Sequence, residues 1–182
     1  MIARRLFGIL AFAACAAVAC GGASTQQPND ASRAATSGGP SAPDFTIDTI
    51  DGNQFHLADH VGKDVVVIDF WTTFCQPCIG ALHHLEKMYE QHKGQGFVVL
   101  GIAMDPPETA GQVGSFTRSH GLTFPVAHDA QSRVTDLYNK KSSAPYQVLI
   151  GRDGRILKIR ESFQPGDEVG MEQDVETALL AK

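Results

Sequence analysis

The sequence is poor in cysteine, and it lacks both a long hydrophobic run and an excess of positive charge. Its 182 residues include four cysteines, which are too few for a small fold held together by several disulfides. The longest apolar run, Leu6 to Val18, is shorter than the roughly 20 residues that a membrane-spanning helix needs. A net charge of -5 at pH 7 argues against nucleic acid as a partner.

The first residues predict export across a membrane. Arg4 and Arg5 precede the apolar run, as in a secretory signal peptide. Residues 17–19 (Ala-Val-Ala) fit ordinary signal cleavage, whereas residues 18–20 (Val-Ala-Cys) resemble the lipobox of bacterial lipoproteins. Because the mature chain would otherwise carry one unpaired thiol, we expect Cys20 to be lipidated. A soluble periplasmic protein is the alternative.

The chain is predicted to have three segments. Residues 1–19 are the expected signal peptide. Residues 20–42 carry only two charged side chains and no aliphatic side chain larger than that of alanine, so they predict a flexible tether without a core. Residues 43–182 are long enough for one domain with its own hydrophobic core.

This domain alternates apolar runs with helical patterns, which predicts an α/β fold. Strands that alternate with helices form parallel pairs, whereas a hairpin at each end of the domain adds antiparallel strands. We therefore expect a mixed central sheet flanked by helices, with an N-terminal hairpin. The expected strands are 44–50, 54–57, 65–70, 97–104, 123–127, 146–150 and 155–160, and the expected helices are 79–89, 108–120, 134–138 and 169–179.

The C-x-x-C motif of residues 75–78 is the strongest indication of function. It lies between a buried strand and a helical pattern, where the helix dipole stabilises a thiolate. Cys75 at the exposed end is expected to attack, and Cys78, about one turn further on, to resolve the mixed disulfide. A zinc site would need further ligands at compact spacing, and a purely structural bridge over so short a loop gains little. We expect a redox disulfide, with no metal and no cofactor.

Three neighbouring side chains are candidates for the same site. Asp69 is a carboxylate inside an otherwise apolar strand. Burial would raise its pKa towards neutrality, where a general base works best. Trp71 and Phe74 flank the motif and are expected to form an apolar contact surface for a substrate, with plain core packing as the alternative for either one.

Together these motifs resemble the bacterial, membrane-tethered TlpA- and ResA-like thiol–disulfide oxidoreductases, which have a thioredoxin-like fold. The resemblance covers residues 43–182. It rests on the strand that runs through Asp69 into the C-x-x-C motif, on Ala144-Pro145 before a later strand, and on the Asp153-Gly154 turn. The segment from Glu108 to Phe124 corresponds to the central insertion of the subfamily.

The resemblance implies roles for individual residues. Asp69 corresponds to the buried acid that accepts the proton of the resolving thiol. Pro145 corresponds to a cis-proline, and Ala144 before it presents its backbone to the substrate. Glu108 falls where ResA-like proteins place an acidic residue near the site, which implies a part in catalysis; a surface glutamate that opens a helix explains it equally well. Gln147 departs from the pattern, because threonine is common at that position.

The resemblance also implies partners. The dithiol would reduce disulfides of protein substrates, such as apocytochrome c before haem attachment or a metallochaperone, and a membrane electron donor would renew it. The protein would face the periplasm, anchored to the membrane through the lipid on Cys20.

Two other functions fit parts of the pattern. A peroxiredoxin-like peroxidase needs a threonine three residues before its reactive cysteine, as Thr72 stands before Cys75, but Ile68 replaces the proline expected four residues before that threonine. A Cu(I) delivery protein would use the two cysteines as soft ligands, and His128 is the loop histidine that would join them.

Overall fold

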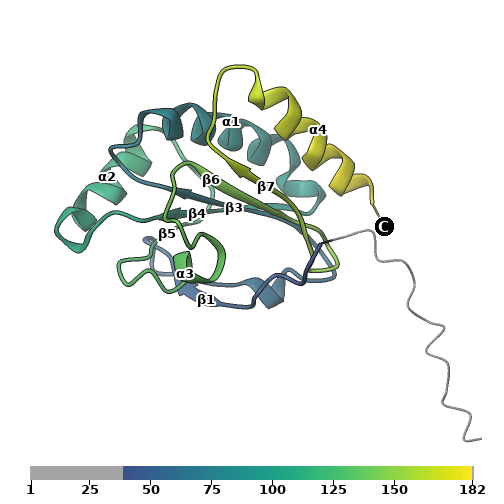
Figure 1. Ribbon diagram of the computed structural model, residues 1–182, viewed down its shortest axis with the longest axis horizontal. Coiled ribbons are helices and arrows are strands. Elements are labelled where there is room, and N and C mark those ends of the chain that lie inside the picture. Colours follow the sequence, from purple (N-terminus) through teal and green to yellow (C-terminus); the bar gives the residue numbers. More distant parts are fainter. Residues whose placement is uncertain (1–38, 182) are drawn as a thin grey trace, which may run out of the picture. The chain divides into compact units, whose positions relative to one another are not determined.

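A computed structural model describes residues 39–181, which form an α/β domain (Figure 1). The predicted signal peptide, Cys20 and most of the predicted tether lie outside the described residues. The strands are β1 (Thr46–Asp48), β2 (Gln54–His56), β3 (Val65–Trp71), β4 (Phe97–Ala103), β5 (Val126–His128), β6 (Tyr146–Ile150) and β7 (Ile156–Glu161). The helices are α1 (Gln76–His92), α2 (Ala110–Ser119), α3 (Thr135–Tyr138) and α4 (Asp167–Leu180), with single 3-10 turns at Leu57–Asp59, Lys93–Gln95 and Pro107–Thr109.

The central sheet is mixed, as predicted, with the strand order β5-β4-β3-β6-β7. β3 and β5 both run parallel to β4, whereas β6 is antiparallel to β3 and to β7. The parallel strands are joined through helices, while a turn with Gly154 at φ 73° joins β6 to β7. β1 and β2 form the predicted N-terminal hairpin as a separate two-stranded sheet.

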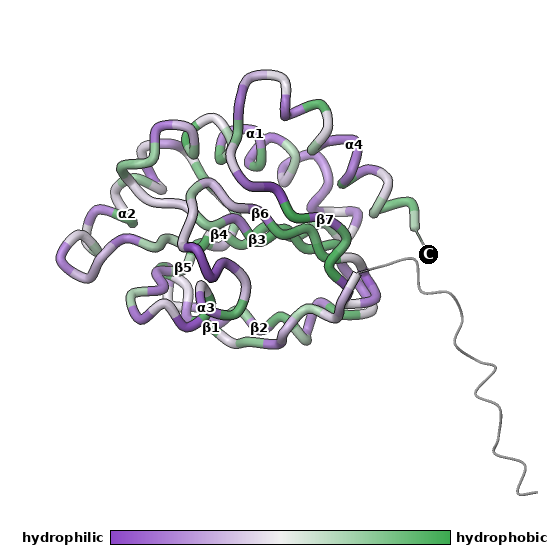
Figure 2. Tube along the Cα trace, in the orientation of Figure 1, coloured by the Kyte–Doolittle hydropathy of each residue, from purple (hydrophilic) through white to green (hydrophobic). Residues whose placement is uncertain are grey.

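Apolar side chains cover both faces of this sheet. One face packs against α1, α2 and α4, and the other packs against the β1-β2 hairpin and α3 (Figure 1). Every residue of β3 is buried, and the middle strands are the most hydrophobic part of the chain trace (Figure 2). This two-sided cover explains why β3 reads as a continuous apolar run with a single carboxylate.

The domain begins before the predicted boundary at residue 43. Gly39 donates a hydrogen bond from its N–H to the carbonyl of Ile156 at 3.0 Å, and Ala42 donates to the carbonyl of Gly154 at 2.9 Å. Composition alone places residues 39–42 in the tether, whereas these hydrogen bonds attach them to the folded domain. Backbone pairing needs no apolar side chain, so composition could not reveal it.

Several elements differ from the predictions. The strand predicted at 123–127 starts only at Val126, because Pro125 has no N–H and the Thr123 N–H donates to the Glu86 carboxylate at 2.7 Å. The helix predicted at 108–120 begins as a 3-10 turn, and α2 proper starts at Ala110. In α4, Val169 faces solvent, while Met171, Val175 and Ala178 face the sheet.

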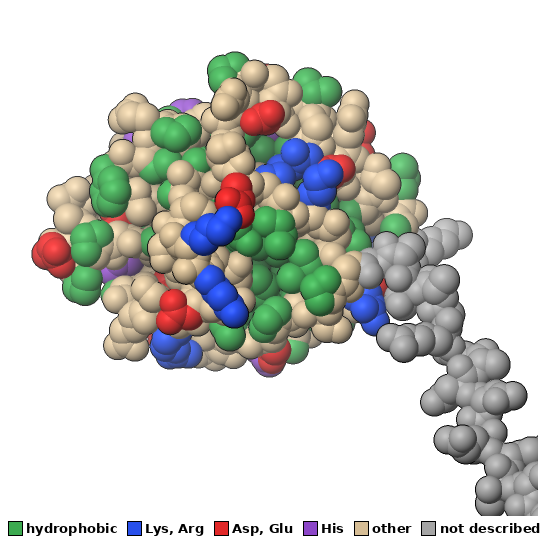
Figure 3. Space-filling model, viewed as in Figure 1, with side chains coloured by type: hydrophobic (Ala, Val, Ile, Leu, Met, Phe, Trp, Pro, Cys, Tyr) green, Lys and Arg blue, Asp and Glu red, His purple; other side chains and the backbone are tan. Residues whose placement is uncertain are grey.

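Among residues 39–181, no helix is both long enough and apolar enough to cross a membrane. The face seen in Figure 3 intersperses acidic and basic side chains with hydrophobic ones and has no broad area of one charge. Such a surface offers no concentrated field for a polyanion.

Candidate active site

The C-x-x-C motif lies where β3 passes into α1. Cys75 is the N-cap residue of α1, with φ -86° and ψ 98°, and Pro77 lies in the first turn, where a missing N–H leaves no bond unmade. Cys75 and Cys78 form a disulfide, with their Cα atoms 5.3 Å apart. Cys75 is half-buried and Cys78 fully buried. The first cysteine is therefore the one that a partner can reach.

The start of α1 favours a negatively charged sulfur at Cys75 once the disulfide is reduced. The helix is 17 residues long and has no acidic side chain in its first turn. Its dipole therefore acts on Cys75 without a competing acidic side chain in the first turn.

Asp69 lies in the middle of β3 with no exposed surface. Burial raises the pKa of this carboxyl from its ordinary 3.8 to about 7, and the amide of Gln147 offsets part of that rise. Side chains alternate along a strand, so Asp69 points to the same face as Val67 and Trp71, which is also the face that Cys78 packs against. The acid and the resolving cysteine thus share one side of the sheet.

The peptide bond between Ala144 and Pro145 is cis, as the resemblance implies. Pro145 is buried and directly precedes β6, which pairs with β3. Ala144 is half-buried and packs against the same hydrophobic cluster as Cys75. Cys75 and Ala144, distant in the sequence, therefore border the same hydrophobic cluster.

The two aromatic candidates have different environments. Phe74 is 69% exposed beside Cys75, so its ring is available to a partner. Trp71 is fully buried, and its ring centroid lies 4.9 Å from that of Phe116. The prediction that Trp71 forms part of the contact surface is wrong, because its side chain fills the core beneath the motif.

Glu108 does not join the site through any contact in residues 39–181. It is exposed in the 3-10 turn and makes no hydrogen bond or ion pair with a described residue. The acidic residue that does contact the motif's turn is Asp105, which is 1% exposed. Its carboxylate accepts hydrogen bonds from the Thr73 N–H at 3.1 and 3.2 Å and from the Thr73 hydroxyl.

Asp105 holds the turn before Cys75 in place, and sequence reasoning missed it. The available signal was an acid two residues after the buried strand β4, which runs parallel to β3 and ends at the same edge of the sheet. His128 links β5 to the same segment, since its Nε2 lies 2.6 Å from the Asp105 carbonyl.

The described residues contain no group of three or more His, Cys, Asp and Glu side chains arranged to hold a metal ion. His128 is engaged at Nε2, as a donor to the Asp105 carbonyl. A copper site with His128 would have to break that contact.

Comparison with known proteins gives a consistent result. The AhpC/TSA family matches residues 39–159. The thiol–disulfide oxidoreductase ResA of Geobacillus kaustophilus is 33% identical over 121 residues, covering 66% of this chain and 67% of the relative. ResA of Bacillus subtilis is 32% identical over 129 residues, covering 71% of this chain and 70% of the relative.

Solved structures agree. A candidate thiol:disulfide interchange protein DsbE from Chlorobium tepidum superimposes with a TM-score of 0.71 and 32% identity, covering 78% of this chain and 97% of that one. A candidate protein disulfide isomerase from Bacteroides thetaiotaomicron gives a TM-score of 0.72 and 29% identity, covering 79% and 90%.

Proposed function

This chain belongs to the AhpC/TSA family and is a thiol–disulfide oxidoreductase with a thioredoxin-like fold, and on that premise we propose that it reduces disulfides of exported proteins. The observation that carries the proposal is the arrangement at the start of α1, where a half-buried Cys75 is paired with a fully buried Cys78. One sulfur is accessible to a partner, and the other is protected until it is needed.

The first step begins from the reduced dithiol. The Cys75 thiolate attacks one sulfur of the partner disulfide, forms a mixed disulfide and releases the other partner sulfur as a thiolate. In the second step the Cys78 thiol gives its proton to the Asp69 carboxylate and attacks the Cys75 sulfur. The second partner thiolate leaves, and Cys75 and Cys78 are oxidised to the disulfide. An electron donor then returns two electrons to the disulfide, and the proton held by Asp69 goes back to Cys78, which restores the Cys75 thiolate and the Cys78 thiol.

The surroundings support this division of roles. Phe74 offers an exposed apolar ring next to Cys75, and Ala144, before the cis-proline, lies in the same region. Asp69, with a pKa of about 7, is ionised in about half of the molecules at neutral pH and is able to accept a proton there.

The sequence supports a proposed location and proposed partners. The signal-like N-terminus and the cysteine at position 20 support a protein that faces the periplasm on a lipid anchor. The resemblance to ResA-like proteins favours apocytochrome c or a metallochaperone as the substrate, with a membrane protein as the electron donor. No cofactor is needed, because both electrons reside in the sulfur pair.

A Cys78→Ser variant tests the proposal. Without the resolving thiol, the mixed disulfide at Cys75 has no intramolecular route to break down. The variant should therefore accumulate adducts with exported proteins and with a model disulfide substrate such as insulin. Non-reducing gels, with and without a thiol reductant, would reveal these adducts. A variant that also carries Cys75→Ser is the matched control and should form none. If Cys78→Ser forms no adduct while the wild type reduces insulin, the scheme is wrong.

A further inference from the structure

Gln147 faces the buried acid from the neighbouring strand. Asp69 and Gln147 are directly opposite one another in the antiparallel β3-β6 pair, so their side chains emerge on the same face. Gln147 is 6% exposed, and Asp69 has no exposure. Both carboxylate oxygens and Gln147 Nε2 lack a hydrogen bond of normal geometry. Together with Trp71 Nε1, which also lacks a partner, these buried polar atoms lie on the adjacent strands β3 and β6.

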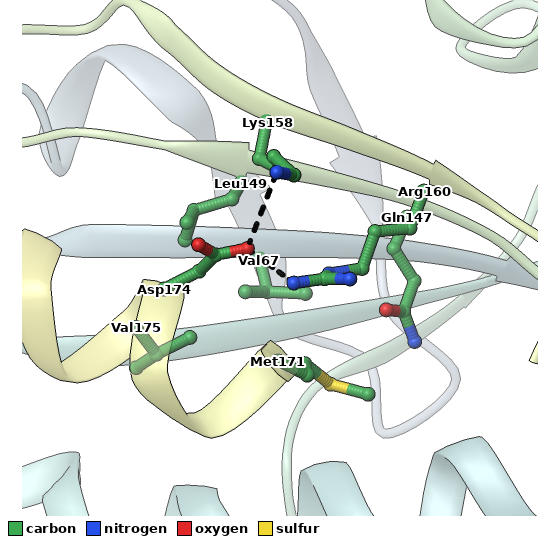
Figure 4. Close-up of a pocket in the computed structure, with 8 residues that line it drawn as sticks. All are labelled: Val67, Gln147, Leu149, Lys158, Arg160, Met171, Asp174 and Val175. Atoms are coloured by element: carbon green, nitrogen blue, oxygen red, sulfur yellow. Dashed lines mark hydrogen bonds and ion pairs between the residues drawn. The ribbon is translucent and has the colours of Figure 1, made fainter. Parts of the chain in front are cut away.

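Arg160, the next residue across the sheet from Gln147, is hydrogen-bonded to α4 rather than to Gln147 or Asp69. Arg160 of β7 lies opposite Gln147, but its guanidinium donates to the Asp174 carboxylate and, at 2.7 Å, to the carbonyl of Gly170 in α4. Figure 4 shows Asp174 between Lys158 and Arg160, with Gln147 beside Arg160 along the same small cavity. The positive charge of Arg160, the residue opposite Gln147, is thus neutralised by Asp174 of α4.

The other elements around Asp69 bring no charge to bear on it. From β4, Gly101 lies opposite Asp69 and has no side chain. Between α1 and α4, His84 interacts with Glu168 and Glu172. The pKa of Asp69 responds to burial and to Gln147, and to none of these charged groups.

We propose that Gln147 is a positioning residue for Asp69. The side-chain amide of Gln147 hydrogen-bonds the Asp69 carboxyl in both of its protonation states and favours the ionised one. An amide N–H donates to a carboxylate, and an amide C=O accepts from a protonated carboxyl. An apolar side chain offers neither. This inference rests on the proposed function only in that Asp69 must gain and lose a proton in every catalytic cycle.

Gln147→Met is the main test, since methionine has a similar length and no amide. In the oxidised protein, carbon NMR of the Asp69 carboxyl measures its titration midpoint directly. Loss of a hydrogen bond to the charged form should raise that midpoint by about one pH unit. At pH 7 the ionised fraction of Asp69 would then fall from about one half to about one tenth. Resolution by Cys78 of a mixed disulfide with glutathione should slow by about fivefold.

Two further variants separate this role from a loss of packing. Arg160→Gln breaks the contact with Asp174 but keeps the amide of Gln147, so the Asp69 midpoint should not move. Gln147→Asn keeps an amide on a shorter stem, and it should shift the midpoint less than methionine does. This second substitution also serves if Gln147→Met does not fold.

The outcomes can be assigned separately. An unchanged Asp69 midpoint in both Gln147 variants would overturn the inference and leave the proposed function standing. In an Asp69→Asn background, Gln147→Met should no longer affect the resolution rate, and an undiminished effect there would also overturn it. If Asp69→Asn alone resolves the mixed disulfide at the wild-type rate, Asp69 has no catalytic role. That conclusion would hold even if Gln147→Met shifts the Asp69 midpoint.

Discussion

Cys75→Ser is expected to reduce the rate of insulin reduction by at least about a thousandfold, because a serine hydroxyl stays protonated where a cysteine thiolate attacks. Serine has nearly the same size, and Cys75 is half-buried at the start of α1, so the fold should be retained. A turbidimetric assay with a thiol reductant as electron donor measures the loss, and circular dichroism checks the fold.

The same assay separates the dithiol mechanism from peroxidase chemistry. If the protein were a peroxidase, wild-type turnover of hydrogen peroxide would exceed its turnover of insulin disulfides. We expect the reverse order, with both activities lost in Cys75→Ser. Insulin reduction by Cys75→Ser at the wild-type rate would contradict the assignment of the nucleophile.

Asp69→Asn is expected to stabilise the oxidised protein, and to do so more strongly as the pH rises. The folded carboxyl has a pKa of about 7, against 3.8 when solvated, so between these values the unfolded chain binds fewer protons than the folded one. Wild-type stability therefore falls as the pH rises from about 4 to about 7, by about 4 kcal/mol in total, and then levels off. Asparagine carries no such dependence.

Urea unfolding of both proteins at pH 5 and pH 8 measures this effect. The stability difference between Asp69→Asn and wild type should grow by about 3 kcal/mol between those pH values. Other titrating groups are common to both proteins and cancel in the difference. Asp136→Asn, at an exposed position, is the control and should show no growth. A pH-independent difference for Asp69→Asn would show that the buried acid has an ordinary pKa.

The sequence was sufficient to predict the sheet and the dithiol. β3 reads as a buried strand because both of its faces are covered, and the C-x-x-C spacing at a helix start carries its own chemistry. Turn glycines and apolar periodicity likewise located both hairpins. These features depend on residues that are close together in the chain.

Features that depend on distant residues were harder to predict. Asp105 contacts Thr73 across 32 positions, and Gln147 lies opposite Asp69 only because β6 pairs with β3. Proximity to the C-x-x-C motif predicts a contact role for Trp71, yet the strand turns its ring into the core. Periodicity gives the face of an element but does not identify what lies across from it.

The central claim is that the start of α1 keeps the Cys75 sulfur ionised near neutral pH, and the ultraviolet absorbance of the thiolate tests it most directly. Titration of the reduced protein should show one thiolate forming with a midpoint well below about 8.5, the value of an unperturbed cysteine. That transition should be absent from reduced Cys75→Ser. If neither sulfur loses its proton until above about pH 8.5, the account of Cys75 as an activated nucleophile is contradicted.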